Sequence, residues 1–118
     1  MIIRGKVISG RQLGRKLGFP TANVAIAEDL QIANGVYSSS VMIDGGDYRA
    51  VSNVGLRPTV GGGERLVESH ILDFSTDLYG QTIEINLIEK LRDEQSFESV
   101  EALRAQVELD IVKVKNIK

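Results

Sequence analysis

Hydrophobic residues have a strand-like spacing in the first part of this chain and a helix-like spacing in the last part. The order of these two patterns restricts the fold more than any other feature. Up to residue 91, apolar and β-branched residues come in short runs, some alternating with polar residues, as in β-strands. From Ser99 onward, apolar residues recur at steps of three and four, as on one face of a helix, and Ser99 suits the N-cap of that helix. The recurring residues are Val100, Leu103, Val107, Ile111 and Val114. We expect strands over residues 2–8, 21–27, 36–43, 48–54, 66–74 and 82–91, and a helix over about 99–116. About six strands before one helix predict an antiparallel sheet or barrel with a packed helix, not alternating βαβ units.

Turn residues separate the expected strands. The run Asp-Gly-Gly-Asp at 44–47 lies between two strand-like segments and predicts a hairpin. Residues 55–65 hold four glycines, a proline and three charges, so we expect a long loop there. The last expected strand alternates, which places Ile83, Ile85, Leu87, Glu89 and Leu91 on one side.

Length and composition exclude several classes of protein. A chain of 118 residues predicts a single domain over 1–118, and its net charge of −2 provides no general attraction for nucleic acid. There is no cysteine and only one histidine, which excludes disulfides and thiolate metal sites and argues against a histidine-rich metal site. The opening apolar run is too short for a signal peptide, and no segment approaches the ~20 apolar residues that span a bilayer. We therefore expect a cytoplasmic protein without a membrane partner.

The segment from residue 10 to 23 combines glycines, cations and small polar side chains. Its glycines stand four apart, with three cations between them: Gly10, Gly14 and Gly18, and Arg11, Arg15 and Lys16. Glycine lets the main chain approach a ligand closely, and exposed N–H groups beside Arg and Lys suit phosphate oxygens. The spacing fits neither of the two common nucleotide-binding fingerprints, and the alternative is a flexible basic loop that leads into a strand.

Thr21 and Asn23 follow Pro20, which holds the backbone extended. Side chains alternate in an extended segment, so these two point to one side and Ala22 and Val24 to the other. Two neutral oxygen ligands next to a phosphate site suit Mg²⁺, which prefers hard oxygen ligands and often shares the phosphates of a nucleotide.

Glu68 lies in the middle of an expected strand, with apolar residues and His70 on the same face. A carboxylate among apolar residues is costly unless it is paired or used. The pattern alone favours the simpler interpretation, a solvent-facing strand position. For His70 we expect a hydrogen bond to a neighbour rather than a catalytic role.

Several motifs, in order and over nearly the whole chain, resemble the riboflavin kinase family. That family occurs alone or as the C-terminal module of bifunctional bacterial FAD synthetases. The matching segments are Gly-Arg-Lys-Leu-Gly-Phe-Pro-Thr-Ala-Asn (14–23), Asn-Gly-Val-Tyr (34–37), Val-Ser-Asn-Val-Gly-Leu-Arg-Pro-Thr (51–59), Glu-Ser-His-Ile-Leu-Asp-Phe (68–74), Asp-Leu-Tyr-Gly (77–80), and Leu-Arg-Asp-Glu (91–94) with Phe97.

The resemblance implies a six-stranded antiparallel Greek-key barrel with the C-terminal helix packed against it. It also implies an ATP-dependent flavokinase that converts riboflavin and ATP to FMN and ADP with Mg²⁺. By this resemblance Glu68 is the catalytic base, and Thr21 and Asn23 bind the nucleotide and ligate the metal. The same resemblance assigns the ATP phosphates to Gly10, Gly14 and Arg15.

The resemblance places the flavin near Arg92, Asp93 and Phe97, and near Asn53 and Arg57. It also makes residues 55–65 a flap over the ligands. From the residues alone, Arg92-Asp93 is a polar exit from the last strand, and Phe97 is a hydrophobic staple for the helix.

Two other functions remain open at this point. One is a flavin- and nucleotide-binding regulatory module that does not catalyse, and the other is a small barrel that binds single-stranded nucleic acid. The second would need stacking aromatics on a basic groove, whereas aromatics make up 5% of this chain. The chain contains no adenylyltransferase module. It fits either a free-standing kinase or one fused to an FMN adenylyltransferase domain.

Overall fold

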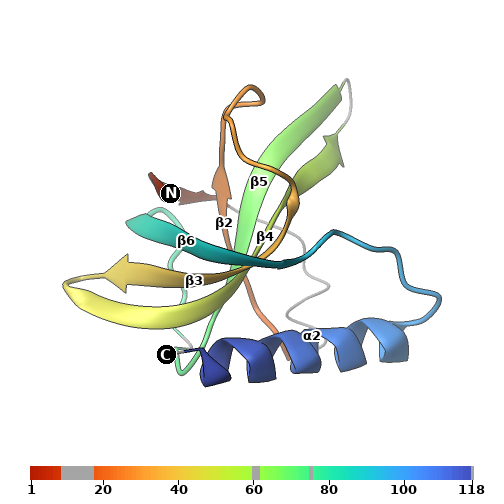
Figure 1. The fold of residues 1–118 in the computed structure, drawn as a ribbon. Helices are drawn as coiled ribbons and strands as arrows, with labels where there is room; N and C mark the ends of the chain where they lie inside the picture. Colours follow the sequence, from red (N-terminus) through yellow and green to blue (C-terminus); the bar gives the residue numbers. More distant parts are fainter. Residues whose placement is uncertain (9–17, 60–61, 75, 118) are drawn as a thin grey trace.

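The structure, a computed structural model, is a closed barrel with one helix packed against its side (Figure 1). It describes residues 1–8, 18–59, 62–74 and 76–117, and of residues 57–59, 62 and 63 the backbone only. In these residues the elements are β1 (Ile2–Ile8), β2 (Ala22–Ala25), β3 (Gly35–Ile43), β4 (Gly46–Thr59), β5 (Gly62–Ile71), β6 (Thr82–Arg92) and α2 (Val100–Asn116). The predicted fold class is confirmed.

The barrel has the order β1-β2-β5-β4-β3-β6, and all neighbouring strands are antiparallel. Strands β3, β4 and β5 follow one another as hairpins, and β6 returns to lie beside β3, which is a Greek key. The β3–β4 turn is made by Asp44 and Gly45, which have φ angles of 48° and 80°. Two positive φ angles in a two-residue loop match the right-handed twist of the flanking strands.

The prediction of a long loop at 55–65 is wrong. Strand β4 continues to Thr59 and β5 begins at Gly62, with Leu56 opposite Arg65 and Thr59 opposite Gly62. Pairing between β3 and β4 ends at Gly35 and Val54. Beyond that point β4 is an edge strand on one side, where a proline is tolerated. Turn residues therefore occur here inside a protruding hairpin.

The barrel interior is a cluster of β-branched and other apolar side chains, among them Val24, Val41, Val54, Val67 and Ile85. It also contains a row of three buried serines from neighbouring strands. The Ser52 hydroxyl lies 2.6 Å from that of Ser39 and 2.7 Å from that of Ser69, and Ser39 donates to the carbonyl of Ala50 at 3.0 Å. Small side chains whose hydroxyls form hydrogen bonds with one another can be buried in a narrow barrel at little cost in free energy.

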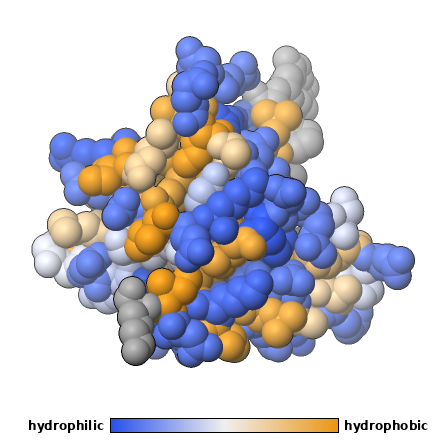
Figure 2. Space-filling model, in the orientation of Figure 1, coloured by the Kyte–Doolittle hydropathy of each residue, from blue (hydrophilic) through white to orange (hydrophobic). Residues whose placement is uncertain are grey.

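Helix α2 lies along the outside of the barrel (Figure 1). Ser99 is its N-cap, as predicted, and accepts a hydrogen bond from the amide of Ala102 at 3.1 Å. Towards the C-terminal end, Val114 is buried with Val36, Val51 and Leu72, and Ile111 and Leu91 pack against that cluster. Hydrophobic and hydrophilic side chains are interspersed over the face drawn in Figure 2, including along the helix.

Two details of the predicted packing are wrong. Val100 was expected on the apolar face of the helix, but it is exposed. Irregularities in the β3–β6 pairing, at Val36/Tyr37 and Ser38/Ser39, interrupt the alternation of β6. Leu91 therefore packs beneath α2, whereas Ile83, Ile85 and Leu87 belong to the interior. In the part of the chain that the structure describes, no helix has the length and apolar character needed to cross a membrane.

Candidate active site

A pocket of about 340 Å³ lies between the outer face of the barrel and residues 103–110 of α2. Its walls combine apolar and aromatic side chains with convergent polar groups, a composition typical of small-molecule sites. The lining residues are Phe19, Thr21, Val36, Val51, Asn53, Glu68, His70, Arg92, Glu94, Gln95, Phe97, Leu103, Val107 and Asp110.

Strand register aligns several of the predicted site residues in one row across the barrel. Asn23 on β2 is opposite Glu68 on β5, and Glu68 is opposite Asn53 on β4. The row continues through Val36 on β3 to Arg92 at the end of β6. Directly opposite residues in antiparallel strands share one face of the sheet. Residues that flank the row, such as Val24, Val67 and Val54, belong to the interior, so the row faces outward.

Glu68 is half-buried in the pocket wall. Glu68 therefore lies on the outer face of the barrel, where it is partly covered by the pocket. The strand partners on both sides present an amide side chain, which places neutral polar groups rather than other carboxylates beside it. A carboxylate in this setting can orient a hydroxyl and accept its proton.

Asn23 and Asn53 contain buried side-chain atoms without a hydrogen-bond partner among the described residues. They are Nδ2 and Oδ1 of Asn23 and Oδ1 of Asn53. Asn23 is 1% exposed. Buried amides are normally satisfied, so atoms of this kind indicate a missing ligand, ion or water. As predicted, Ala22 and Val24 point into the barrel and Asn23 points away from it.

His70 fixes the segment that precedes β2. Its Nδ1 lies 3.0 Å from the carbonyl oxygen of Pro20, and its ring makes an edge-to-face contact with Phe19 at 5.6 Å. The expected hydrogen bond to a neighbour is confirmed. Because Pro20 directly precedes Thr21, this contact holds Thr21 at the pocket, where it lies with Glu68 in the wall.

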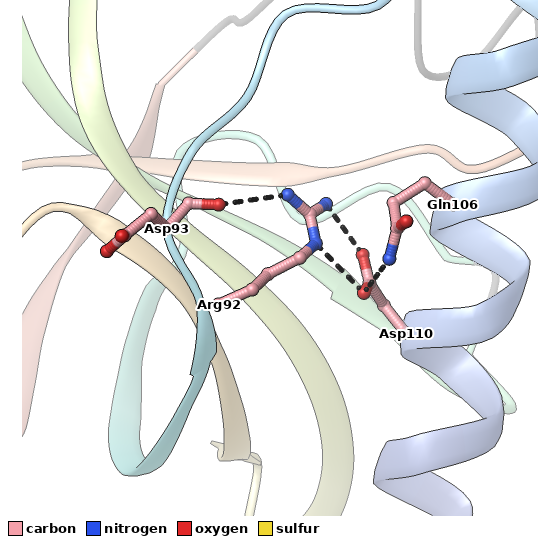
Figure 3. A network of polar contacts seen from close by, with 4 residues as sticks. All are labelled: Arg92, Asp93, Gln106 and Asp110. Carbon is pink, nitrogen blue, oxygen red and sulfur yellow. Dashed lines mark hydrogen bonds and ion pairs between the residues drawn. The ribbon is translucent and has the colours of Figure 1, made fainter.

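Arg92 joins β6 to the helix, as Figure 3 shows. Its Nε and Nη2 donate to the two carboxylate oxygens of Asp110, at 3.1 and 2.8 Å, and its Nη1 donates to the carbonyl of Asp93 at 3.1 Å. Gln106 Nε2 also donates to Asp110, at 3.0 Å. The guanidinium carbon lies 5.9 Å from the centre of the Phe97 ring. Arg92 and Phe97 therefore lie together in the pocket wall.

The Asp93 side chain is directed elsewhere. It is 85% exposed and forms an ion pair with Lys90 at 2.6 Å. The hydrogen bond to the Lys90 ammonium lowers the pKa of Asp93, and the same bond raises the pKa of Lys90. Asp93 thus contributes its carbonyl to the Arg92 network, and its carboxylate is not among the groups that line the pocket.

Some predicted residues cannot be compared with the structure. Gly10, Gly14 and Arg15 lie outside the described residues, and the side chain of Arg57 is not described. Among the residues that are described, no cluster of three or more His, Cys, Asp or Glu could hold a metal ion. A metal at this site would need neutral oxygen ligands such as those of Thr21 and Asn23.

The sequence interpretation missed several lining residues. Val36 and Val51 are expected only as strand residues, and Leu103 and Val107 only as part of the apolar face of the helix. In the structure all four side chains also line the pocket. Asp110 was not singled out at all. Its signal was present, because a carboxylate between Val107, Ile111 and Val114 interrupts the apolar face of an amphipathic helix.

Comparison with known proteins identifies the family of this chain. The family model described as "Flavokinase: Riboflavin kinase" matches residues 1–118. The chain belongs to the riboflavin kinase family. A bifunctional riboflavin kinase/FMN adenylyltransferase of Haemophilus influenzae is 40% identical over 114 residues, which cover 96% of this chain and 37% of that protein. The RNA-binding riboflavin kinase RibR of Bacillus subtilis is 44% identical over 111 residues, 93% of this chain and 48% of that protein.

A solved riboflavin kinase shares the fold. The crystal structure of riboflavin kinase from Trypanosoma brucei superposes with a TM-score of 0.69 at 28% identity, covering 98% of this chain and 77% of that one. The chain thus spans less than half the length of the two relatives named above, one of which carries a second enzymatic activity in its name.

Proposed function

We propose that this chain transfers the γ-phosphoryl group of ATP to the ribityl 5′-hydroxyl of riboflavin, which yields FMN and ADP. The observation that carries the proposal is the position of Glu68. It lies in the wall of the pocket with Thr21 and Asn53. Its register partner Asn23 has a buried amide with no hydrogen-bond partner among the described residues. An acid to accept the proton, polar groups nearby and an apolar cleft for the ring together support phosphorylation of a flavin alcohol.

In the proposed reaction, the 5′-oxygen of riboflavin forms a bond to the γ-phosphorus while the bond from that phosphorus to the β–γ bridging oxygen breaks. Glu68 orients the hydroxyl and accepts its proton, and ADP leaves with the bridging oxygen. Phosphoryl transfer involves little covalent chemistry by the protein, so most of the acceleration comes from positioning and charge stabilisation.

Thr21 and Asn23 fit a magnesium ion. Asn23 presents both a buried oxygen and a buried nitrogen without a described partner. An ion could use the oxygen and a phosphate oxygen could accept from the nitrogen, which would satisfy both atoms at once. When bound, Mg²⁺ would neutralise charge on the transferring phosphoryl group. Gly10, Gly14 and Arg15 are proposed to hold the ATP phosphates.

The apolar part of the pocket suits the flavin. Phe97, Leu103 and Val107 offer flat and aliphatic contacts for an isoalloxazine ring, and Arg92 and Asn53 offer polar groups at its edge. The proposed flavin contacts remain Arg92, Asp93, Phe97, Asn53 and Arg57. For Asp93, the geometry favours its carbonyl over its carboxylate.

The wider setting is part of the same proposal. We expect the chain to act in the cytoplasm, where ATP is abundant, without a membrane or nucleic-acid partner. In a parent protein of the bifunctional kind, the FMN made here would be the substrate of an FMN adenylyltransferase domain. A regulatory module without catalysis is not favoured, because Thr21, Asn23 and Glu68 are all present.

The direct test is to incubate the 118-residue chain with riboflavin, ATP and Mg²⁺ and to separate the flavins by chromatography. We expect FMN to accumulate with an equal amount of ADP, and chelation of the metal to stop the reaction. Riboflavin that binds but is never phosphorylated would instead establish the regulatory module.

A further inference from the structure

The ion pair between Arg92 and Asp110 is an unusual feature of the pocket wall. Asp110 is 1% exposed, on the side of α2 that packs against the barrel. An apolar residue would be usual at such a position. It receives Arg92 through two parallel hydrogen bonds, and Gln106, one turn earlier on the same helix, fixes its orientation (Figure 3). A bidentate pair of this type sets the plane of the guanidinium as well as its position.

Other contacts besides this pair attach the helix to the barrel. The C-terminal end of α2 is already held by Val114 in the cluster with Val36 and Val51. In addition, Arg49 Nη1 donates to the carbonyl oxygens of Val114 and Lys115, at 3.4 and 2.8 Å. A buried ion pair contributes little net stability compared with apolar residues of the same size. A role in orientation explains the pair better than a role in holding the fold together.

The remaining contacts of Arg92 reinforce that role. Asp93 accepts from Nη1, and the Phe97 ring lies near the guanidinium. Of the five N–H groups of an arginine, these bonds use three. The other two, one on each Nη, have no partner among the described residues. Both Arg92 and Asp110 line the pocket, so these groups are available to a ligand there.

We propose that Asp110 is a positioning residue for flavin binding. It holds the guanidinium of Arg92 in one plane, so that the two remaining N–H groups can donate to carbonyl oxygens on the edge of the flavin ring. Gln106 supports Asp110 in this task. The inference rests on the proposed function, because it assumes that the flavin occupies this pocket.

Asp110→Asn keeps the size of the side chain and removes its charge. We expect it to raise the Kd for riboflavin about tenfold, the loss expected for one weakened charge-assisted bond. Riboflavin affinity is read from quenching of flavin fluorescence. Affinity for Mg·ADP, measured by calorimetry, should stay at the wild-type value, because the residues proposed to hold the nucleotide lie elsewhere. Glu108→Gln, an exposed acid on the same helix, is the matched control and should change neither affinity.

A second comparison tests whether Asp110 acts through Arg92. In an Arg92→Lys background the bidentate bond is absent, so adding Asp110→Asn should cause no further loss of riboflavin affinity. An Asp110→Asn variant that binds riboflavin like the wild type would overturn the inference, even if it melted earlier. Equal loss of riboflavin and Mg·ADP would also overturn it, since that result indicates general damage.

Folding failure of Asp110→Asn would not end the test. Gln106→Ala leaves the ion pair intact but frees one side of the carboxylate, and should shift riboflavin affinity in the same direction by a smaller factor. An unchanged affinity in that variant would contradict the inference. Failure of the proposed function is distinguishable, because in that case the wild-type chain itself would bind no riboflavin.

Discussion

Asn23 and Glu68 lie directly opposite each other on β2 and β5, although 44 positions separate them in the sequence. Antiparallel pairing places both side chains on the outer face of the barrel, where Glu68 reaches the pocket and Asn23 is fully buried. This register brings the proposed metal ligand next to the proposed base. Strand pairing thus places two short motifs, far apart in the sequence, side by side.

Glu68→Gln tests the proposed base. The amide keeps the size of the side chain but cannot accept the proton of the 5′-hydroxyl, so kcat should fall about a hundred- to ten-thousand-fold. Binding of riboflavin and Mg·ADP should persist. FMN formation under saturating substrates measures the first effect, and fluorescence quenching and calorimetry measure the second. Glu89→Gln, an exposed acid on β6, is the control, and a Glu68→Gln enzyme as fast as that control would disprove the assignment.

Asn23→Ala separates ligand binding from stability. The amide of Asn23 has no described partner, so its removal should change the free energy of unfolding of the ligand-free protein by less than about 1 kcal/mol. The rise in Tm that Mg·ADP causes in the wild type should disappear, because a ligand stabilises only the state that binds it. Thermal denaturation with and without Mg·ADP measures both effects.

Ser52→Ala is the opposite control for Asn23→Ala. Ser52 is fully buried and bonded to Ser39 and Ser69, so its loss should cost about 1–3 kcal/mol of stability. Its effect on the stabilisation by Mg·ADP should be nil. If Asn23→Ala destabilised the ligand-free protein as much as Ser52→Ala does, Asn23 would be a structural residue.

The sequence predicted most of the fold because its local signals agree with one another. The alternating runs, the hairpin turn predicted at 44–47 and the capped terminal helix each correspond to an element of the structure. The error at 55–65 has a physical cause. Glycines and Pro58 are usual loop residues, yet they also suit an edge hairpin where one strand has lost its second neighbour.

The site was predictable only in part. Thr21, Asn23 and Glu68 stand out because their chemistry is unusual for a strand. The Arg92–Asp110 pair depends on how α2 packs on the barrel, and no local pattern encodes that distance. Likewise, the direction of the Asp93 side chain is set by Lys90 three residues earlier, and a motif cannot distinguish this exposed pair from a ligand contact.

Asp93→Asn should reveal a small, pH-dependent contribution to stability. The hydrogen bond to Lys90 lowers the pKa of Asp93 below its ordinary value of 3.8. The ionised carboxylate therefore stabilises the fold above pH 3.8, and this stabilisation is lost as the pH falls through the lowered pKa. The same hydrogen bond raises the pKa of Lys90 above 10.5. The stabilisation from the lysine charge is therefore fully present below pH 10.5 and is lost as the pH rises through the raised pKa.

The variant should therefore melt slightly below the wild type at about pH 7 and together with it at about pH 2, below the carboxylate range. The difference should shrink in high salt, because the pair is exposed. Tm measured against pH at two salt concentrations checks this, with Glu98→Gln as an exposed control on the same connection. A difference that persisted unchanged at about pH 2 would mean that the carboxylate acts by something other than its charge.

Gly35→Ala should damage the pocket through the backbone. Gly35 has a φ of 154°, and a Cβ there would lie 2.8 Å from the carbonyl oxygen of Arg92 and 2.7 Å from Lys90 Cε. The lysine can move, but the carbonyl belongs to the end of β6, so the strand that carries Arg92 must shift. We expect a loss of about 1–3 kcal/mol in stability. The affinity for riboflavin should fall by a larger factor than the affinity for Mg·ADP.

Gly45→Ala is the matched control for Gly35→Ala. Gly45 also has a positive φ, of 80°, but a Cβ there would meet nothing within 4 Å. It should therefore lose stability through backbone strain alone and leave riboflavin affinity unchanged. Parallel losses of riboflavin affinity in the two variants would show that general destabilisation, and not displacement of Arg92, weakens the flavin site.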